Sequence, residues 1–95
     1  MLNELNKIWE NVLTFEQHKF NKAKHFQSTK NLKNGYSISV LFGSWFYSNG
    51  KNTYEVGILK DNKLCYDTSI TNDVLGYLTK DEIIKVIDQV NKLNK

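Results

Sequence analysis

A chain of 95 residues, 40% of them apolar, is long enough for one compact domain and too short for two. Its formal charge of +3 at pH 7 favours solubility without indicating a particular partner. A domain of this size hides only about 60 to 65% of its unfolded surface, so we expect residues 1–95 to form a single domain with a shallow site rather than a deep catalytic cavity.

The single cysteine, Cys65, excludes an internal disulfide and a multi-cysteine zinc site and favours a reducing compartment. No apolar run approaches the roughly 18 residues of a membrane-spanning helix, and the polar N-terminus lacks the apolar stretch of a signal peptide. We therefore expect a cytoplasmic protein without membrane contact. All thirteen basic residues are lysine. Because arginine is the side chain best suited to bidentate contacts with guanine, this composition disfavours sequence-specific DNA reading.

The first predicted element is an amphipathic helix over residues 2–15. Apolar residues recur there at helical spacing, and polar residues such as Glu4 and Lys7 occupy the other side. From residue 16 to residue 34 the pattern weakens, and the run Gln-Ser-Thr-Lys-Asn at residues 27–31 is typical of a break. We expect a helical extension or an irregular connection in this part of the chain.

Strands are predicted next. Residues 36–42 alternate as a half-buried strand does, and we expect the strand to resume at residues 45–47 after a bend or bulge at Gly43. The Asn-Gly pair at residues 49 and 50 is a strong hairpin signal, so this strand should pair with one that begins at Tyr54. A second tight turn at residues 60–63 leads into a third predicted strand over residues 64–70.

A helix is predicted at the C-terminal end. Residues 71–76 resemble a turn or one helical coil that ends with Gly76 in a left-handed conformation. Thr79 and Glu82 have the spacing of a capping box. The apolar stripe of the helix is Ile83, Ile84, Ile87, Val90 and Leu93. The predicted fold is thus α+β: helix, three-stranded antiparallel meander, helix, with both helices packed on one sheet face.

Lysines dominate the middle of the chain, where no acidic residue occurs between Glu16 and Glu55. Such a segment attracts phosphate or a carboxylate-rich protein surface, and interleaved aromatic side chains can stack on bases. The alternative is a solvated basic face whose aromatic side chains belong to the core. The candidate binding residues of this segment are Lys19, Lys22, Lys24, Lys30, Lys33 and Tyr36.

Two further candidate binding residues, Trp45 and Tyr47, belong to an aromatic cluster. If both rings lie on the sheet face opposite the helices, they are suitable anchors for a protein interface, because aromatic rings bury a large area at little entropic cost. The bend expected at Gly43 leaves open whether these two rings face outward or whether Phe46 does.

Catalytic and metal-binding patterns are weak. His18 and His25 are seven residues apart, which would place them on one helix face, but two ligands do not make a metal site. Cys65 has no neighbouring histidine to lower its pKa. The chain contains no glycine-rich phosphate loop, nucleophile elbow or zinc-binding helix motif. The sequence therefore predicts no enzyme, no cofactor and no metal site.

Residues 54–79 follow the pattern Y-E-V-x-I-L-K-x-x-x-L-x-Y-D-T-x-I-T-x-D-V-x-G-Y-L-T. This segment resembles the C-terminal halves of small phage and mobile-element proteins of Gram-positive bacteria. The resemblance implies a host or defence protein as the target, and an anti-CRISPR-type inhibitor as the role. We therefore expect a small binding protein that occupies a macromolecular surface. Two alternatives are a lysine-based nucleic-acid-binding module and a small homodimeric structural or accessory protein.

Overall fold

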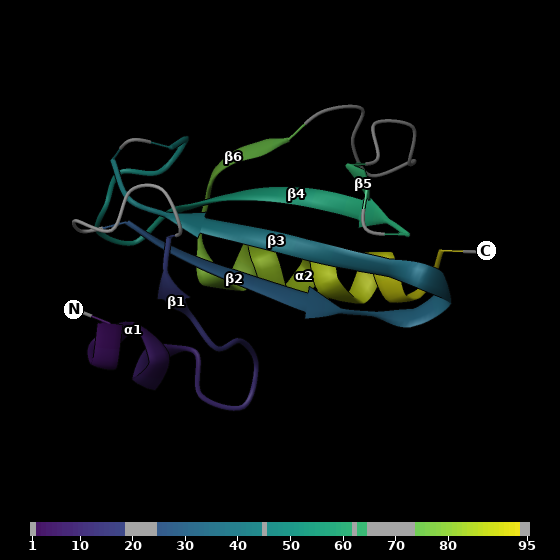
Figure 1. Cartoon of the computed structure of the whole chain (residues 1–95), viewed down its shortest axis with the longest axis horizontal. Helices are drawn as coiled ribbons and strands as arrows, with labels where there is room; N and C mark the ends of the chain where they lie inside the picture. The colour runs from purple at the N-terminus through teal and green to yellow at the C-terminus, as the bar shows by residue number, and fades with distance from the viewer. Residues whose placement is uncertain (1, 19–24, 45, 62, 65–73, 94–95) are drawn as a thin grey trace.

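The fold combines an antiparallel sheet with two helices (Figure 1). The computed structural model describes residues 2–18, 25–44, 46–61, 63–64 and 74–93. The elements are α1 (Leu2–Ile8), β1 (Glu16–Gln17), β2 (Phe26–Asn31), the 3-10 helix η1 (Lys33–Gly35), β3 (Tyr36–Phe42), β4 (Tyr54–Lys60), β5 (Lys63–Leu64), β6 (Leu75–Leu78) and α2 (Lys80–Asn91). Neither described helix is both long and apolar enough to cross a membrane.

The described strands form one six-stranded sheet, so the predicted three-stranded meander is wrong although the α+β class holds. The sheet has the order β1-β2-β3-β4-β5, and β6 pairs with β4 as well. Because β3 occupies one edge of β4, β5 and β6 share the other edge, β5 near Lys60 and β6 near Tyr54. The predicted pairing of β3 with β4 is confirmed over six residue pairs. Most of the third predicted strand and the turn after it, residues 65–73, lie outside the described residues.

β2 lies in the region where the sequence predicted a helical extension or an irregular connection. Its sequence contains a single large apolar residue, Phe26, and therefore lacks the alternation that marks a half-buried strand. The strand forms because it pairs with β3 along its whole length, from Phe26 opposite Phe42 to Asn31 opposite Ser37. Strand pairing in the tertiary structure thus overrides a weak local preference.

α1 ends at Ile8, well before the predicted boundary at residue 15. Asn11 adopts a φ of 66°, a left-handed conformation that asparagine tolerates better than most residues and that stops helical propagation. The chain then turns, and the Asn6 side chain makes two hydrogen bonds to the backbone of Phe15. Its amide NH2 group donates to the Phe15 carbonyl, and its amide oxygen accepts the Phe15 N–H. This turn brings Leu13 and Phe15 into the core together with Trp9.

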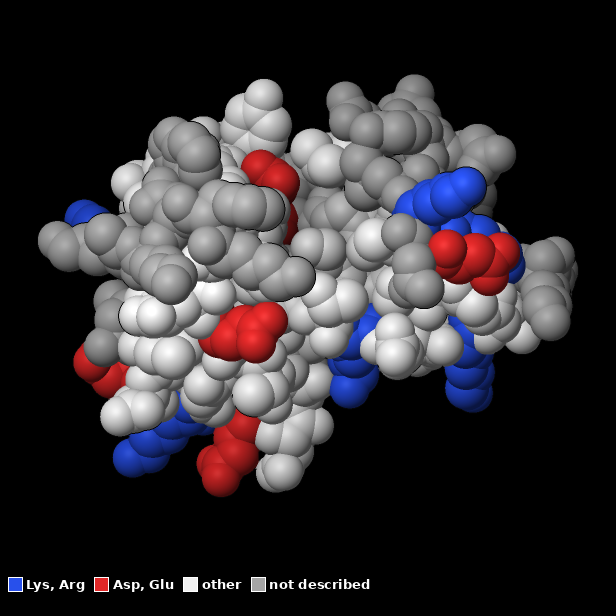
Figure 2. All heavy atoms as spheres, in the orientation of Figure 1, with Lys and Arg blue, Asp and Glu red and all other residues white. Residues whose placement is uncertain are grey.

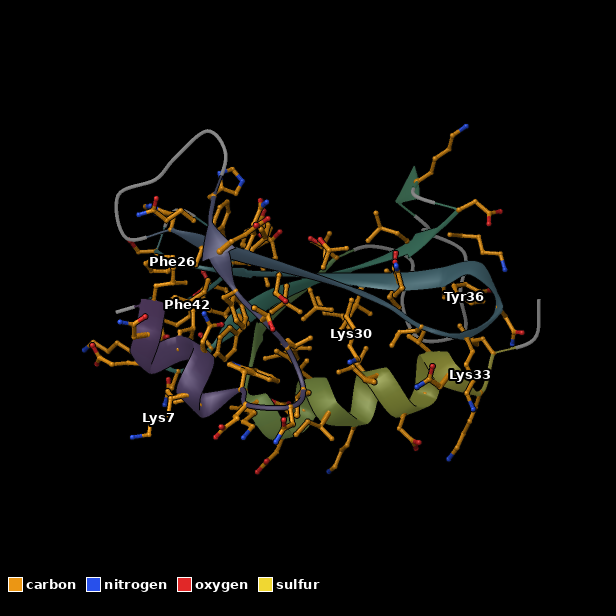
Figure 3. All side chains as sticks on the ribbon, turned by 60° about the horizontal axis from the view of Figure 1, so that its bottom comes forward. Lys7, Phe26, Lys30, Lys33, Tyr36 and Phe42 are labelled. Carbon is orange, nitrogen blue, oxygen red and sulfur yellow. The ribbon has the colours of Figure 1, made fainter. Side chains whose placement is uncertain are left out.

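The core lies between one face of the sheet and the two helices, which are on the same side of it (Figure 3). Trp9 is fully buried at its centre, where its indole N–H donates to the Tyr54 hydroxyl over 2.9 Å. The two rings meet edge to face, with centroids 5.2 Å apart. The buried apolar residues are Leu5, Trp9, Leu13, Phe15, Phe26, Ile38, Val40, Phe42, Tyr54, Val56, Ile58, Ile83, Val86 and Val90.

The Tyr54 hydroxyl gives this core a dependence on alkaline pH. Burial raises the pKa of Tyr54 above its ordinary value of 10.0, and the hydrogen bond from Trp9 offsets part of that increase. A raised folded-state pKa contributes stability that is complete below pH 10 and is lost as the pH rises through the folded pKa. We expect the unfolding free energy from urea titration to fall above pH 10, and to fall less in Tyr54→Phe. If the unfolding free energies of the wild type and of Tyr54→Phe fell equally steeply with pH above 10, this prediction would be wrong.

The predicted capping box at the start of α2 is confirmed. Thr79 is the N-cap and accepts a hydrogen bond from the Glu82 backbone N–H, while the Glu82 carboxylate accepts the Thr79 N–H over 3.0 Å. The predicted apolar stripe is only partly right. Ile83 and Val90 are buried, but Ile84 is 40% exposed, and Val86 occupies the core instead.

We expect the capping box of Thr79 and Glu82 to stabilise α2 less in acid. Hydrogen bonds from the Thr79 backbone N–H and then from its hydroxyl lower the pKa of Glu82 below its ordinary value of 4.5. A lowered folded-state pKa gives stability that is present above pH 4.5 and is lost as the pH falls through the folded pKa. We expect Glu82→Gln to lower the urea midpoint at pH 7 and to match the wild type at pH values below that pKa. Thr79→Ala should lose about 1 kcal/mol at pH 7.

Candidate binding surface

The structure describes half of the candidate binding residues that the sequence predicts. Lys30, Lys33, Tyr36 and Tyr47 belong to described parts of the chain. The remaining four, Lys19, Lys22, Lys24 and Trp45, lie outside the described residues, as does Cys65.

Lys30 has a structural role. Its partner in the β2–β3 register is Ile38, so its side chain is on the sheet face that carries the helices. The ammonium group donates to the Val12 carbonyl over 3.0 Å, and the side chain is half-buried. Lys30 therefore ties the segment after α1 to the sheet, as its position between sheet and helices in Figure 3 illustrates.

Lys33 and Tyr36 lie together at the β2–β3 turn, at the opposite end of the sheet from Phe26 and Phe42 (Figure 3). Lys33 is exposed, and its backbone N–H donates to the Asn91 side chain. The Tyr36 ring is half-buried beneath the Lys60 ammonium, which is 4.0 Å from the ring centroid. Because Tyr47 follows the other end of β3, the described candidates do not form one surface.

Phe46 and Tyr47 belong to the loop over residues 43–53, so the predicted continuation of the strand is wrong for these two residues. Gly43, with a φ of 141°, ends β3. The Asn49 carboxamide oxygen then accepts three successive backbone N–H groups, those of residues 51, 52 and 53. The Asn-Gly signal thus marks an internally bonded loop in place of a two-residue turn.

Phe46 is half-buried against two histidines from the β1–β2 connection. Its ring centroid is 5.1 Å from that of His18 and 5.5 Å from that of His25. The predicted placement of these histidines on one helix face is wrong, because the His18 N–H donates to the His25 carbonyl across a hairpin. The described residues contain no group of three or more His, Cys, Asp or Glu side chains that is suited to a metal ion.

Tyr47 forms an exposed pair with Tyr77, a residue that no pattern in the sequence marks as a binding residue. The side chains are 57% and 58% exposed, and their ring centroids are 6.3 Å apart at an angle of 55°. Two hydrogen bonds hold the backbone at this pair: the Tyr77 N–H donates to the Tyr47 carbonyl over 2.9 Å, and the Tyr47 N–H donates to the Glu55 carboxylate over 3.0 Å. We call these three residues, Tyr47, Glu55 and Tyr77, the tyrosine notch.

A bulge in β6 positions Tyr77. Tyr54 pairs with Leu78 and Val56 pairs with Leu75, so two residues, Gly76 and Tyr77, lie opposite Glu55 alone. The predicted left-handed Gly76 is wrong, because the positive φ, 56°, belongs to Tyr77. Gly76 has a spatial role instead, since a Cβ there would be 2.9 Å from the Cβ of Tyr47.

Charges are divided between the two faces of the sheet. The register places the strand lysines, Lys30, Lys60 and Lys63, on the helix-bearing side. The other side, the open face, carries a row across four strands that consists of Glu16, Gln27, Leu41 and Glu55. We call it the acidic row. Figure 2 shows that uncharged atoms make up much of the visible surface on this side.

Within the described residues, two exposed aromatic rings thus lie beside the carboxylate of Glu55. The open face is unevenly exposed: Ser37 is buried there, whereas Asn31, its partner on β2, is exposed. Comparisons of the chain with protein-family models, with curated proteins and with solved structures found no match.

Proposed function

We propose that this chain is a small, non-enzymatic binding protein that inhibits or modulates a host factor by occupying a macromolecular surface. The exposed Tyr47–Tyr77 pair, whose backbone is held by two hydrogen bonds, is the observation that carries the proposal. Tyrosine rings supply large contact areas with few rotatable bonds, so they lose little entropy on binding. Such rings are typical of the residues that dominate the energy of protein interfaces.

The resemblance of residues 54–79 to phage and mobile-element proteins supports a defence factor in the host cytoplasm as the target. Glu55 and Tyr77, two of the three residues of the tyrosine notch, belong to that segment. An anti-CRISPR-type inhibitor is the specific form we propose. Because the chain carries a net charge of +3, imitation of DNA by a dense negative surface does not fit it.

Affinity capture with matched variants tests the binding function. The tagged protein, Tyr47→Ala, Tyr77→Ala and the control Lys33→Ala would each be incubated with a lysate of a Gram-positive host. We expect a specific partner that is retained by the wild type and by Lys33→Ala, which alters the far end of the sheet, and that is lost from both tyrosine variants. The purified partner should also lose activity when the wild-type protein is added.

A partner held equally by all four proteins would contradict the assignment of the tyrosine notch. The absence of any specific partner would contradict the binding function itself. Circular dichroism of each variant checks that the fold is intact, which we expect because both tyrosine side chains are more than half exposed.

A nucleic-acid-binding module is the second candidate, favoured by the lysines at the β2–β3 and β4–β5 turns, Lys33, Lys60 and Lys63. Several lysine–phosphate contacts predict that affinity for a mixed pool of DNA and RNA falls by orders of magnitude between about 50 and 200 mM salt. The carboxylates of the acidic row repel phosphate from the open face. We therefore expect no binding at the lower salt concentration, and a steep salt dependence would favour this module over our proposal.

A homodimeric accessory protein is the third candidate, and the open sheet face is where a second copy would pack. Sedimentation analysis distinguishes it, because self-association gives a mass that rises with protein concentration. We expect the mass to stay at that of one chain, 11.1 kDa, since two acidic rows would face each other in a symmetric contact.

A further inference from the structure

We propose that the tyrosine notch is a cation-binding site that receives a lysine or arginine side chain from a basic segment of the partner protein. The inference rests on the proposed binding function and specifies the chemistry of the partner at one place on the surface. The observations that carry it are the mutual geometry of the two rings, the position of Glu55 and the backbone conformation of Tyr77.

The two rings lie close to each other, and both are exposed to solvent. Their centroids are 6.3 Å apart, and the ring planes are inclined to each other by 55°. A cation within about 6 Å of an aromatic centroid is attracted by the ring, so the two centroids are close enough for one ammonium or guanidinium group to interact with both. At an exposed site each ring is expected to improve affinity roughly two- to fivefold.

Glu55 supplies the negative charge beside the rings. One of its carboxylate oxygens accepts the Tyr47 N–H, and the side chain is half-buried, so the group is held in place. A fixed carboxylate favours a positively charged ligand, and with arginine it can form a charge-assisted hydrogen bond. Glu16, at the other end of the acidic row, gives the same face a second negative charge.

The separation of charges across the sheet favours a basic protein segment over a nucleic acid. On the strands, carboxylates occupy the open face while Lys30, Lys60 and Lys63 are on the helix-bearing side. A partner that approaches the open face of the described strands therefore meets the carboxylates of Glu16 and Glu55, although the whole chain carries a charge of +3. These two carboxylates repel phosphate groups and attract lysine and arginine side chains.

Tyr77 adopts a backbone conformation that does not suit its residue type. Its φ of 56° is uncommon for a residue other than glycine, asparagine or aspartate, and a bulky aromatic side chain makes it less favourable. Glycine would adopt this φ without strain. The neighbouring residue is a glycine, Gly76, but the positive φ belongs to Tyr77 and not to Gly76. The ring of Tyr77 is 58% exposed, so burial in the core does not compensate for the strain. A role of the ring in binding accounts for a tyrosine here.

An NMR titration of the full chain with hexalysine and hexaarginine peptides tests the site, with hexaglutamate as the charge-reversed probe. We expect the basic peptides to cause saturable chemical-shift changes that centre on Tyr47, Glu55, Gly76 and Tyr77, and hexaglutamate to cause none there. Tyr77→Gly should weaken binding about two- to fivefold while its thermal midpoint stays unchanged or rises, because the backbone strain is relieved. Tyr77→Phe keeps the ring and should bind as the wild type does.

Glu55→Gln and Glu16→Gln form a matched pair, because each removes one negative charge from the same face. The carboxamide introduced by Glu55→Gln keeps an oxygen that can accept the Tyr47 N–H, so the loop stays in place. We expect Glu55→Gln to weaken binding by a factor similar to that of Tyr77→Gly, and Glu16→Gln to have a smaller effect. Equal effects of the two changes, or unaltered affinity of Tyr77→Gly, would overturn the proposal.

The outcomes separate this inference from the proposed function. A host partner that depends on Tyr47 and Tyr77, together with no binding of either basic peptide, would leave the binding function standing and overturn the cation chemistry. Binding of basic peptides at the notch without any host partner would support the cation site and count against the proposed function.

Discussion

Trp9→Ala is expected to lower the free energy of unfolding by about 3 to 5 kcal/mol, the range for replacing a buried tryptophan or phenylalanine by alanine. Trp9 has no exposed surface, and it connects the segment after α1 to the sheet through its contacts with Phe15 and Tyr54. The substitution leaves a cavity and also removes the donor to the Tyr54 hydroxyl. Because small domains have only about 5 to 15 kcal/mol of total stability, the variant should unfold at a much lower urea concentration.

Trp9→Phe is the matched control. It retains an aromatic ring in the core and loses the indole N–H, so its unfolding free energy should fall by less than that of Trp9→Ala. Urea unfolding followed by circular dichroism measures both variants. A loss below about 1 kcal/mol for Trp9→Ala would contradict the docking of the N-terminal segment, because only a largely exposed side chain gives so small an effect.

Ile83→Ala and Ile84→Ala are expected to differ strongly although the residues are adjacent and chemically identical. Ile83 has no exposed surface and packs in the core, so its truncation should lower the unfolding free energy by about 2 to 5 kcal/mol. Ile84 is 40% exposed, and its substitution should change that free energy by no more than about 0.5 kcal/mol. The favourable helix propensity of alanine reduces any loss at this position further.

The same urea titration measures the pair. Similar losses for both substitutions would mean that Ile84 is buried against something in solution and that the helix stripe predicted from the sequence is right. The comparison therefore tests the orientation of α2 on the sheet, independently of any function.

Elements with strong local signals were predictable from the sequence. β3 and β4 alternate between apolar and small or polar residues over the first part of each strand, and the turn after Lys60 and the capping box at Thr79 depend on neighbouring residues alone. Local patterns of this kind require no knowledge of the remaining chain. The structure confirms each of these predictions among the residues that it describes.

Elements set by distant partners were not predictable. β2 lacks alternation and forms through its pairing with β3, while α1 stops early where Asn11 adopts a left-handed conformation. The apolar residues Val12 and Leu13 fitted a longer helix, and only the tertiary packing of the segment shows that they follow a turn. The hydrophobic pattern of the sequence fits the predicted elements as well as it fits the observed ones, so the pattern alone does not distinguish between them.

The candidate site illustrates the same limit. Tyr47 was selected because aromatic residues cluster near it, and its exposure agrees with a surface role. Glu55 joins it through the hydrogen bond from the Tyr47 N–H, and Tyr77 joins it only through the bulge of β6 on β4, which brings together residues from distant parts of the sequence. Lys30 was chosen for its charge, but its ammonium group bonds to the Val12 carbonyl within the fold.

The contact between Trp9 and Tyr54 joins positions 45 residues apart, with a consequence for synthesis of the chain on the ribosome. At about 5 to 20 residues per second, Tyr54 is added on the order of 2 to 9 s after Trp9. During that interval β2 and β3 are added, but β4, which carries Tyr54, is still missing from the sheet that covers the apolar side chains of the N-terminal segment. The docking surface of this hydrophobic segment is therefore incomplete until β4 has been made.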